Sequence, residues 1–305
     1  MAGRNKYSTS QLLNFATDSY LERTSRPIYA IVFLLPFIIF YELGTIFINT
    51  DVLNQSQVRV VAFVWVQRAL EYVGFGSKLA WVAPPLAVVV ILIALQMASG
   101  KKWYLSFGDL GPMAIECILL AVPLIVFSLF LNASTERPND TGRFNSKTIS
   151  IQPQDEPAFS RYVVRSSSLS TAAENVGGEA KNQSLLANIV TGIGAGIYEE
   201  LIFRLILICV LMIVFQDVFR LSHKQSIVFS VLVSAALFSA HHHIVFLDGH
   251  LTSRTPFNWA EFGFRTVAGI YFAAIFAIRG FGITAGTHGF YDIIATAINA
   301  VFFTQ

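Results

Sequence analysis

The chain contains few charged residues. Lysine, arginine, aspartate and glutamate together make up 13% of its 305 residues, whereas roughly a quarter of an ordinary soluble domain is charged. Hydrophobic residues make up 54%, so a soluble globular domain is nearly excluded and an integral membrane protein in a lipid bilayer is expected. The net charge is only +2 and no basic run with interleaved aromatic residues occurs, so no nucleic-acid partner is expected.

The chain is also poor in cysteine and in common catalytic signatures. Cys117 and Cys209 lie inside apolar segments, where they are typical of small core residues and indicate no disulfide framework. The His-Glu-x-x-His zinc helix and the Gly-x-Ser-x-Gly nucleophile elbow are missing. Clues to function must therefore come from single polar residues inside the hydrophobic segments.

Long hydrophobic runs are the main feature of the sequence. At about 1.5 Å per residue, a helix of 20 residues crosses a hydrocarbon core of roughly 30 Å. The predicted crossings are 28–48, 79–98, 112–131, 185–218, 227–241, 259–278 and 281–303. We therefore expect an all-α fold, a polytopic transmembrane helical bundle of about seven to eight membrane segments.

Two segments do not fit a simple crossing. Residues 58–75 carry three charged side chains among apolar ones, which favours an interfacial helix or a short span. Residues 185–218 are too long for one straight crossing, and we expect a bend near 192–196, where three glycines alternate with other residues.

The charges divide the chain into four parts. Residues 1–27 hold six of the 40 charges and residues 132–184 hold twelve, which leaves 22 for the other 225 residues. The predicted parts are a polar N-terminal tail or interfacial helix (1–27), N-terminal membrane helices (28–131), a polar, largely flexible extramembrane insertion (132–184) and a motif-bearing membrane core (185–303).

The positive charges predict the orientation. Lysine and arginine accumulate in short cytoplasmic loops, and residues 1–27 carry four of them. We expect a cytoplasmic N-terminus and, with seven crossings, a C-terminus on the opposite side.

The first group of ionisable residues in a predicted span is Glu199-Glu200-x-x-x-Arg204. Each such residue costs at least about 2.5 kcal/mol in lipid. Glu200 and Arg204 are four residues apart and can pair on one helix face, whereas Glu199 points elsewhere and stays able to exchange a proton. A structural salt-bridge cluster that locks helices together is the alternative.

Two further groups lie in later spans. Phe238-x-x-x-His242 stands in a segment that ends with three consecutive histidines, 241–243, and His288-x-x-x-Asp292 lies in the last span. The histidine run alone could be interfacial polarity. An aspartate one turn from a histidine can fix the tautomer of its imidazole, whether the partner is a metal or a reacting oxygen.

The ordered set of motifs resembles the glutamate-type intramembrane endopeptidases, the family of CAAX prenyl endopeptidases and bacteriocin-processing proteins. Its motifs are Glu-Glu-x-x-x-Arg, Phe-x-x-x-His and His-x-x-x-Asn/Asp, and the resemblance covers about residues 185–303. It implies an endopeptidase that cleaves a membrane-associated peptide or membrane-protein substrate.

The resemblance also implies residue roles. Glu199 and His242 would activate the attacking water, and His288 and Asp292 would stabilise the oxyanion of the tetrahedral intermediate. The supporting structural residues would be Glu200, Arg204 and Phe238.

The last motif position raises the question of a metal. Asp292 replaces the commoner asparagine, and a charged carboxylate cannot donate a hydrogen bond to an oxyanion. It would be protonated, orient His288 or bind a metal. His242, His288 and Asp292 could bind zinc, although we favour a metal-free glutamate mechanism.

Two other functions stay open at this point. A non-catalytic immunity or scaffold protein could use the same fold to bind a partner. A proton-coupled transporter is less favoured, because the chain shows no repeated halves.

Overall fold

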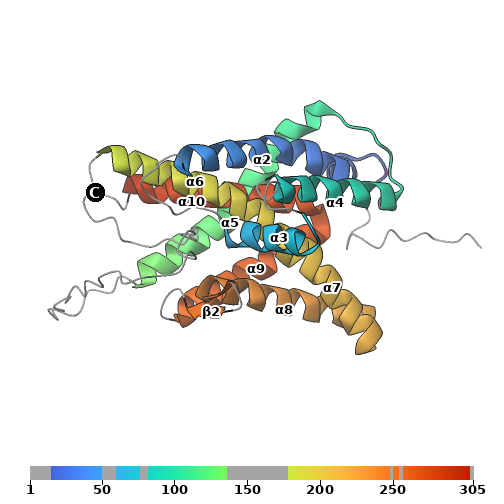
Figure 1. The fold of residues 1–305 in the computed structure, drawn as a ribbon. Helices are drawn as coiled ribbons and strands as arrows, with labels where there is room; N and C mark the ends of the chain where they lie inside the picture. The colour runs from blue at the N-terminus through green and yellow to red at the C-terminus, as the bar shows by residue number, and fades with distance from the viewer. Residues whose placement is uncertain are drawn as a thin grey trace, which may run out of the picture.

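The protein is described by a computed structural model that covers residues 15–49, 60–75, 82–135, 178–247, 250–253 and 257–302. Its elements are α1 (Tyr20–Thr24), α2 (Pro27–Asn49), α3 (Val61–Tyr72), α4 (Ala83–Ser99), η2 (Phe107–Asp109), α5 (Leu110–Thr135), α6 (Gly178–Glu200), η3 (Leu201–Leu207), α7 (Ile208–Ile213), η4 (Val214–Val218), α8 (His223–His243), β1 (Ile244–Leu247), β2 (His250–Ser253), α9 (Trp259–Arg279) and α10 (Phe281–Phe302). The predicted all-α fold is confirmed (Figure 1). Within the described residues, the one addition is a short antiparallel hairpin of β1 and β2, in which Leu247 pairs with His250.

Five helices in the described part are long and apolar enough to cross a membrane. They are Pro27–Ile48, Phe107–Leu131, Leu185–Val218, His223–His243 and Trp259–Arg279. α4 is also apolar but shorter, and α10 contains several polar and small residues. The structure thus supports the predicted polytopic bundle, with five of the seven predicted crossings meeting both length and composition.

α3 is the short helix expected from residues 58–75. Its 12 residues span only about 18 Å, which is less than the hydrocarbon core of roughly 30 Å. Its first turn, Val61 to Val64, is buried, whereas Tyr72 at its other end is exposed. α3 therefore enters the bundle by its N-terminal end.

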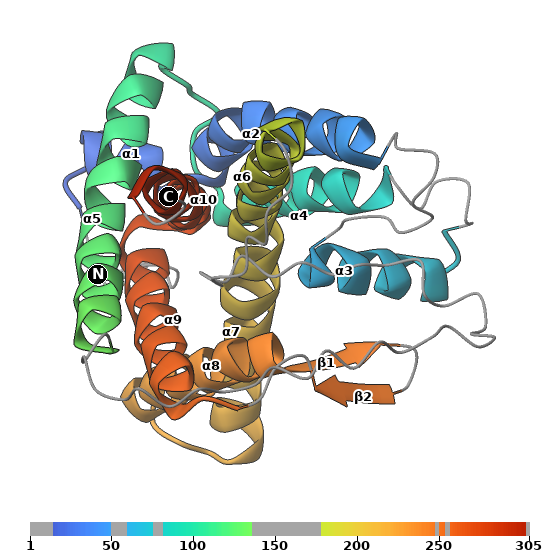
Figure 2. The ribbon, with the colours of Figure 1, turned by 90° about the vertical axis from the view of Figure 1, so that its left-hand side faces the viewer.

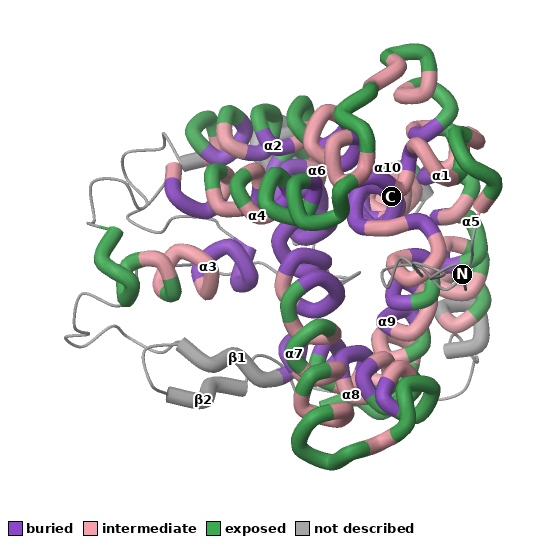
Figure 3. The backbone as a smooth tube through the Cα atoms, turned by 90° about the vertical axis from the view of Figure 1, so that its right-hand side faces the viewer, coloured by how far each residue is buried: buried purple, intermediate pink, exposed green. Residues whose placement is uncertain are grey.

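The centre of the molecule is formed by α2, α6 and α10, which lie side by side (Figure 1). α5 packs along α10, and α8 pairs with α9 on the side away from α2 and α4 (Figure 2). The longest buried stretches belong to α6 and α10 (Figure 3). These two helices carry two of the three sequence motifs, so the motifs face the interior.

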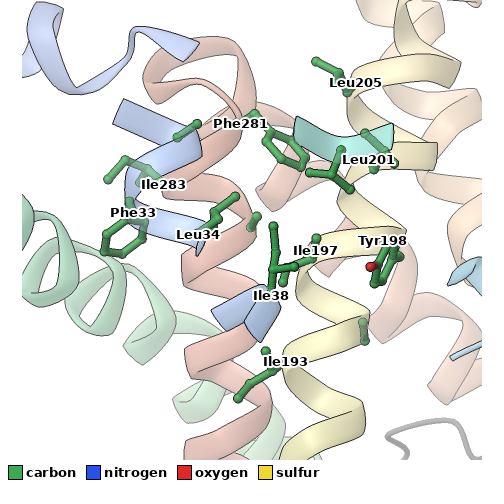
Figure 4. Packing of buried hydrophobic residues seen from close by; sticks show 14 of the residues in the cluster. Phe33, Leu34, Ile38, Ile193, Ile197, Tyr198, Leu201, Leu205, Phe281 and Ile283 are labelled. Carbon is green, nitrogen blue, oxygen red and sulfur yellow. The ribbon is translucent and has the colours of Figure 1, made fainter. Parts of the chain in front are cut away.

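Apolar side chains from the central helices interdigitate. Leu34 of α2, Ile197 of α6 and Ile283 of α10 are each at most 1% exposed, and they converge in one cluster (Figure 4). Lipid is as apolar as these side chains, so close packing, more than removal from water, holds membrane helices together.

Glycine permits a close contact between α6 and α10. A Cβ atom on Gly196 would stand 2.6 Å from the Gly289 nitrogen and 2.8 Å from the Ala285 oxygen, so no larger residue fits. α6 is α-helical through 192–196, where a bend is predicted. The glycines of this run permit close packing.

The helix departs from α geometry directly after the two glutamates. Residues Leu201–Leu207 form the π-helix η3, and π-helical turns occur frequently at functional sites. The hydroxyl of Ser234, on α8, donates a hydrogen bond of 2.6 Å to the carbonyl of Phe203. This bond satisfies a backbone oxygen in the irregular segment and joins it to α8.

The helices extend into both ends of the predicted insertion. α5 continues to Thr135 and α6 begins at Gly178, so these parts of 132–184 are helical. Residues 136–177 of the predicted flexible insertion and residues 1–14 of the predicted N-terminal tail lie outside the described residues.

A network of ion pairs ties α1 to the ends of longer helices. The buried Arg279 of α9 contacts both carboxylate oxygens of Glu116, on α5, and also donates to the hydroxyl of Thr24. Arg23 donates two bonds of 3.0 Å to the carboxylate of Asp109. We refer to these side chains, with Asp18, Glu22 and Arg26, as the α1 network.

The carboxylates of α1 and the preceding turn are held in their charged form. The hydrogen bond from Arg26 lowers the pKa of Asp18 below its usual value. Burial raises the pKa of Glu22, but the hydrogen bond and positive charge of Arg26 outweigh this effect and lower it overall. The α1 network is therefore stabilised at neutral pH and weakened in acid.

Candidate active site

The ends of α6 and α8 bring one carboxylate to two imidazoles. Glu199 Oε1 lies 3.5 Å from His241 Nε2, and Glu199 Oε2 lies 3.8 Å from His242 Nε2. All three side chains are buried. Both separations are longer than a usual hydrogen bond of about 2.7–3.2 Å, so the carboxylate and imidazoles face one another across a short gap.

A second cluster is built around Glu200. Its carboxylate lies 3.1 Å from Arg204 Nε and 2.7 Å from His288 Nδ1. The other imidazole nitrogen, His288 Nε2, is 3.6 Å from Asp292 Oδ2. The pairing of Glu200 with Arg204 agrees with the predicted helix face. The structure adds that the same carboxylate orients His288.

Aromatic rings separate and support the two clusters. The Phe238 ring lies 5.1 Å from that of His242 and 6.0 Å from that of His288, measured between centroids. The Arg204 guanidinium is 4.2 Å above the Phe238 ring, a favourable cation–π position. Phe272 stacks on His288 at 4.6 Å. Phe238 therefore contacts both imidazoles and the buried cation, as a supporting residue should.

The structure brings the sequence-predicted residues together. Glu199, His242, His288 and Asp292 are all between 4% and 8% exposed. Adjacent positions on α6, Glu199 and Glu200, contact His242 and His288 respectively. The geometry thus groups the four residues, while their catalytic roles stay predictions.

His241 is the site residue that the sequence motifs missed. It lies nearer to Glu199 than His242 does, and its Nδ1 is 2.8 Å from the carbonyl of Phe238. Of the three consecutive histidines, only His243 faces away, toward Phe257. The histidine run was visible in the sequence, but the Phe-x-x-x-His spacing selects only one member of it.

The structure groups potential metal ligands differently from the prediction. One ligand atom each of Glu199, His241 and His242 lies within 4.8 Å of the others. Among the described residues, the predicted set of His242, His288 and Asp292 does not form such a group. The reason is that His288 is held by Glu200, while His242 turns toward Glu199. Two imidazole nitrogens and a carboxylate oxygen suit zinc in ligand type.

The fold and the site define a class of protein: an integral membrane helical bundle with a buried glutamate and histidine site. Residues 181–294, which contain all three motifs, match the family model described as Type II CAAX prenyl endopeptidase Rce1-like. This part of the chain is similar to that protease family, and the resemblance drawn from the motifs is confirmed. No curated protein and no solved structure matches the chain.

Proposed function

We propose that this protein is an intramembrane endopeptidase in which Glu199 and His242 activate the water that cleaves a membrane-associated substrate. One observation carries the proposal. The carboxylate of Glu199 faces two imidazoles at 3.5 and 3.8 Å, whereas its neighbour Glu200 is committed to Arg204 and His288. Glu199 is thus the carboxylate placed to exchange a proton.

The reaction begins with water held between Glu199 and His242. Glu199 accepts a proton from the water while the oxygen of that water bonds to the scissile carbonyl carbon. The carbonyl oxygen thereby becomes an oxyanion. When the tetrahedral intermediate collapses, the carbon–nitrogen bond breaks and Glu199 returns the proton to the leaving amine. The products are one carboxylic acid and one amine, so water is the sole co-reactant.

His288 is the donor placed to stabilise the oxyanion. Its Nδ1 is fixed by Glu200 at 2.7 Å, while its Nε2 lies 3.6 Å from Asp292. This second distance is too long for a good hydrogen bond. Since Nδ1 donates to the Glu200 carboxylate, Nε2 donates to a substrate oxygen when the imidazole is protonated on both nitrogens. In this arrangement Asp292 orients and electrostatically supports His288 and does not itself donate, which explains how aspartate can stand in place of asparagine.

The family suggests the first substrate to test. Its description names CAAX prenyl endopeptidases, so a prenylated peptide cleaved near its C-terminus is the leading candidate. The apolar helices support a membrane location, which a lipid-modified substrate would share. The cytoplasmic position of the N-terminus stays a prediction.

The direct test compares protein termini in the native membrane. Cells carrying the wild-type chain should contain cleaved membrane-protein termini that disappear when the copy is Glu199→Ala. His243→Ala is the matched control, because His243 is buried on the same helix but faces Phe257, and it should retain the cleaved termini. Mass spectra that show identical termini for wild-type and Glu199→Ala cells would refute the protease assignment.

A further inference from the structure

We propose that Arg265, on α9, binds the C-terminal carboxylate of the substrate and so directs the protease to bonds close to a free C-terminus. The inference deepens the proposed function and rests on it. Arg265 lies outside the three sequence motifs. Its guanidinium is a different group from that of Arg204, which is paired with the buried Glu200.

α9 packs against the site helix α8 on both sides of Arg265. Before this residue, the hydroxyl of Ser239, on α8, donates a hydrogen bond of 2.8 Å to the carbonyl of Phe262. After it, a Cβ atom on Gly269 would stand 3.0 Å from the backbone of α8, four residues before Ser239. Arg265 therefore belongs to the stretch of α9 that passes Phe238, the ring that supports both site imidazoles.

The positive charge of Arg265 acts on residues of the site. It influences the imidazole of His242, on α8, and the phenol of Tyr291, which precedes Asp292 on α10. The guanidinium therefore lies close to site residues from two other helices. One of them, His242, is an imidazole that faces Glu199.

Part of the Arg265 guanidinium is available to a ligand. Its side chain is 15% exposed, and its Nη1 lies 3.2 Å from the carboxylate of Glu261, which is 53% exposed. Exposed pairs of this kind contribute little to stability. Within the described part of the chain, Nε and Nη2 have no hydrogen-bond partner, and they are not sealed from solvent. A carboxylate can therefore accept two parallel hydrogen bonds from this edge of the guanidinium.

A substrate carboxylate needs a cation in this site. Glu199, Glu200 and Asp292 place three carboxyl groups in the buried interior, and the guanidinium of Arg204 balances that of Glu200. Like charges in a poorly solvated interior repel each other strongly. A terminal carboxylate is accepted there beside a separate positive charge, which Arg265 supplies.

The length of a CAAX terminus suits this position. Such a sequence ends three residues after its prenylated cysteine, and three extended residues span up to about 10 Å. The axes of packed helices lie about 8–10 Å apart. A peptide whose cysteine carbonyl is held between Glu199 and His242 therefore carries its terminal carboxylate about as far as the neighbouring helix, α9.

The test compares two forms of one farnesylated peptide, which ends three residues after its cysteine in either a free carboxylate or a carboxamide. For the full wild-type chain in detergent, kcat/KM should be about 10- to 100-fold higher for the carboxylate form, because the carboxamide loses the charged hydrogen bonds. The difference should fall on KM and not on kcat, because the terminus takes no part in the bond that breaks.

Variants assign the preference to one residue. Arg265→Gln should cleave the two forms equally well, and Arg265→Lys, which keeps the charge but not the fork of donors, should restore part of the preference. Glu261→Gln frees Nη1 and should discriminate at least as strongly as wild type. Arg220→Gln is the matched control, because Arg220 is exposed and precedes the opposite end of α8 from His242. It should discriminate as wild type does, and melting curves confirm that each variant is folded.

A binding measurement separates this inference from the proposed function. Fluorescently labelled forms of both peptides are titrated into Glu199→Gln, alone and combined with Arg265→Gln. Tighter binding of the carboxylate form that is lost with Arg265→Gln supports the carboxylate site, even where wild type cleaves neither peptide and the protease is overturned. Equal cleavage of both forms by wild type, or a preference that survives in Arg265→Gln, overturns the carboxylate site and leaves the protease standing. A chain that neither binds nor cleaves either peptide also overturns the carboxylate site, and the protease is then judged by the termini in native membranes.

Discussion

The α1 network and the active-site cluster use buried charge in opposite ways. In the α1 network, Arg279 forms close contacts with both carboxylate oxygens of Glu116, and guanidinium and carboxylate match each other fully. In the active site, Glu199 faces only imidazoles, at 3.5 Å or more. The directly bonded pairs of the α1 network hold helices in place. The wider spacing between Glu199 and the two imidazoles leaves room for a water or an ion.

The largest stability effect should come from Arg204→Ala. This change removes the guanidinium that pairs with the fully buried Glu200, and breaking a buried pair costs about 3–5 kcal/mol. Because Glu200 also orients His288, activity should fall together with the melting temperature in detergent. An unchanged melting temperature would mean that the Glu200 cluster is not structural.

Arg279→Ala should sharpen the contrast, because it damages stability alone. The variant loses the contacts to Glu116 and Thr24, at a cost of about 3 kcal/mol. Cleavage per folded molecule should stay near the wild-type rate, since Arg279 contacts the ends of helices and no residue of the candidate site. Specific activity is measured on the folded fraction from size-exclusion chromatography. A specific activity that falls tenfold would contradict the view that the α1 network affects stability and not catalysis.

Gly196→Ala should have an intermediate effect on both properties. The new Cβ would collide with the backbone of Gly289 and Ala285, and overpacking of this kind costs about 1–3 kcal/mol. Separation of α6 from α10 would also move Glu200 away from His288. Gly263→Ala on α9 is the control, because nothing lies within 4 Å of its Cβ position. The control should melt at or slightly above the wild-type temperature.

Acid should weaken the α1 network by a small amount. The pKa of Glu22 is lowered in the folded protein from its usual 4.5, so its contribution to stability is complete above that value and is lost as pH falls through the folded pKa. The melting temperature of wild type should therefore decline more steeply below about pH 5 than that of Glu22→Gln. Parallel curves for the two proteins would show that Glu22 contributes nothing.

Much of the fold could be predicted, because membrane helices are continuous apolar runs. The predicted crossing at 28–48 differs from α2 by one residue at each end, and the crossing at 259–278 ends one residue before α9 does. The π-helix η3 could not be predicted, because its hydrogen-bonding pattern depends on tertiary partners such as Ser234. Helix periodicity alone gives no sign of it.

The site was predictable in its members but not in its pairings. Spacing along a helix places Glu200 on one face with Arg204, and the structure has this pair. The contact between Glu200 and His288 joins residues 88 positions apart, which a helical pattern cannot show. His241 was hidden for a related reason, since the end of α8 turns two consecutive histidines toward one carboxylate.

The most direct test of the account is the cleavage rate and the melting temperature of Glu199→Gln, measured side by side. The substitution keeps the shape of the side chain and removes its ability to accept a proton. If Glu199 is the base, cleavage of a processed substrate should fall by about 10²- to 10⁴-fold, while the melting temperature stays near that of wild type. A variant that cleaves at the wild-type rate would contradict the assignment of Glu199 as the base. It would also contradict the distinction between the paired charges of the α1 network and the proton-exchanging carboxylate of the active site.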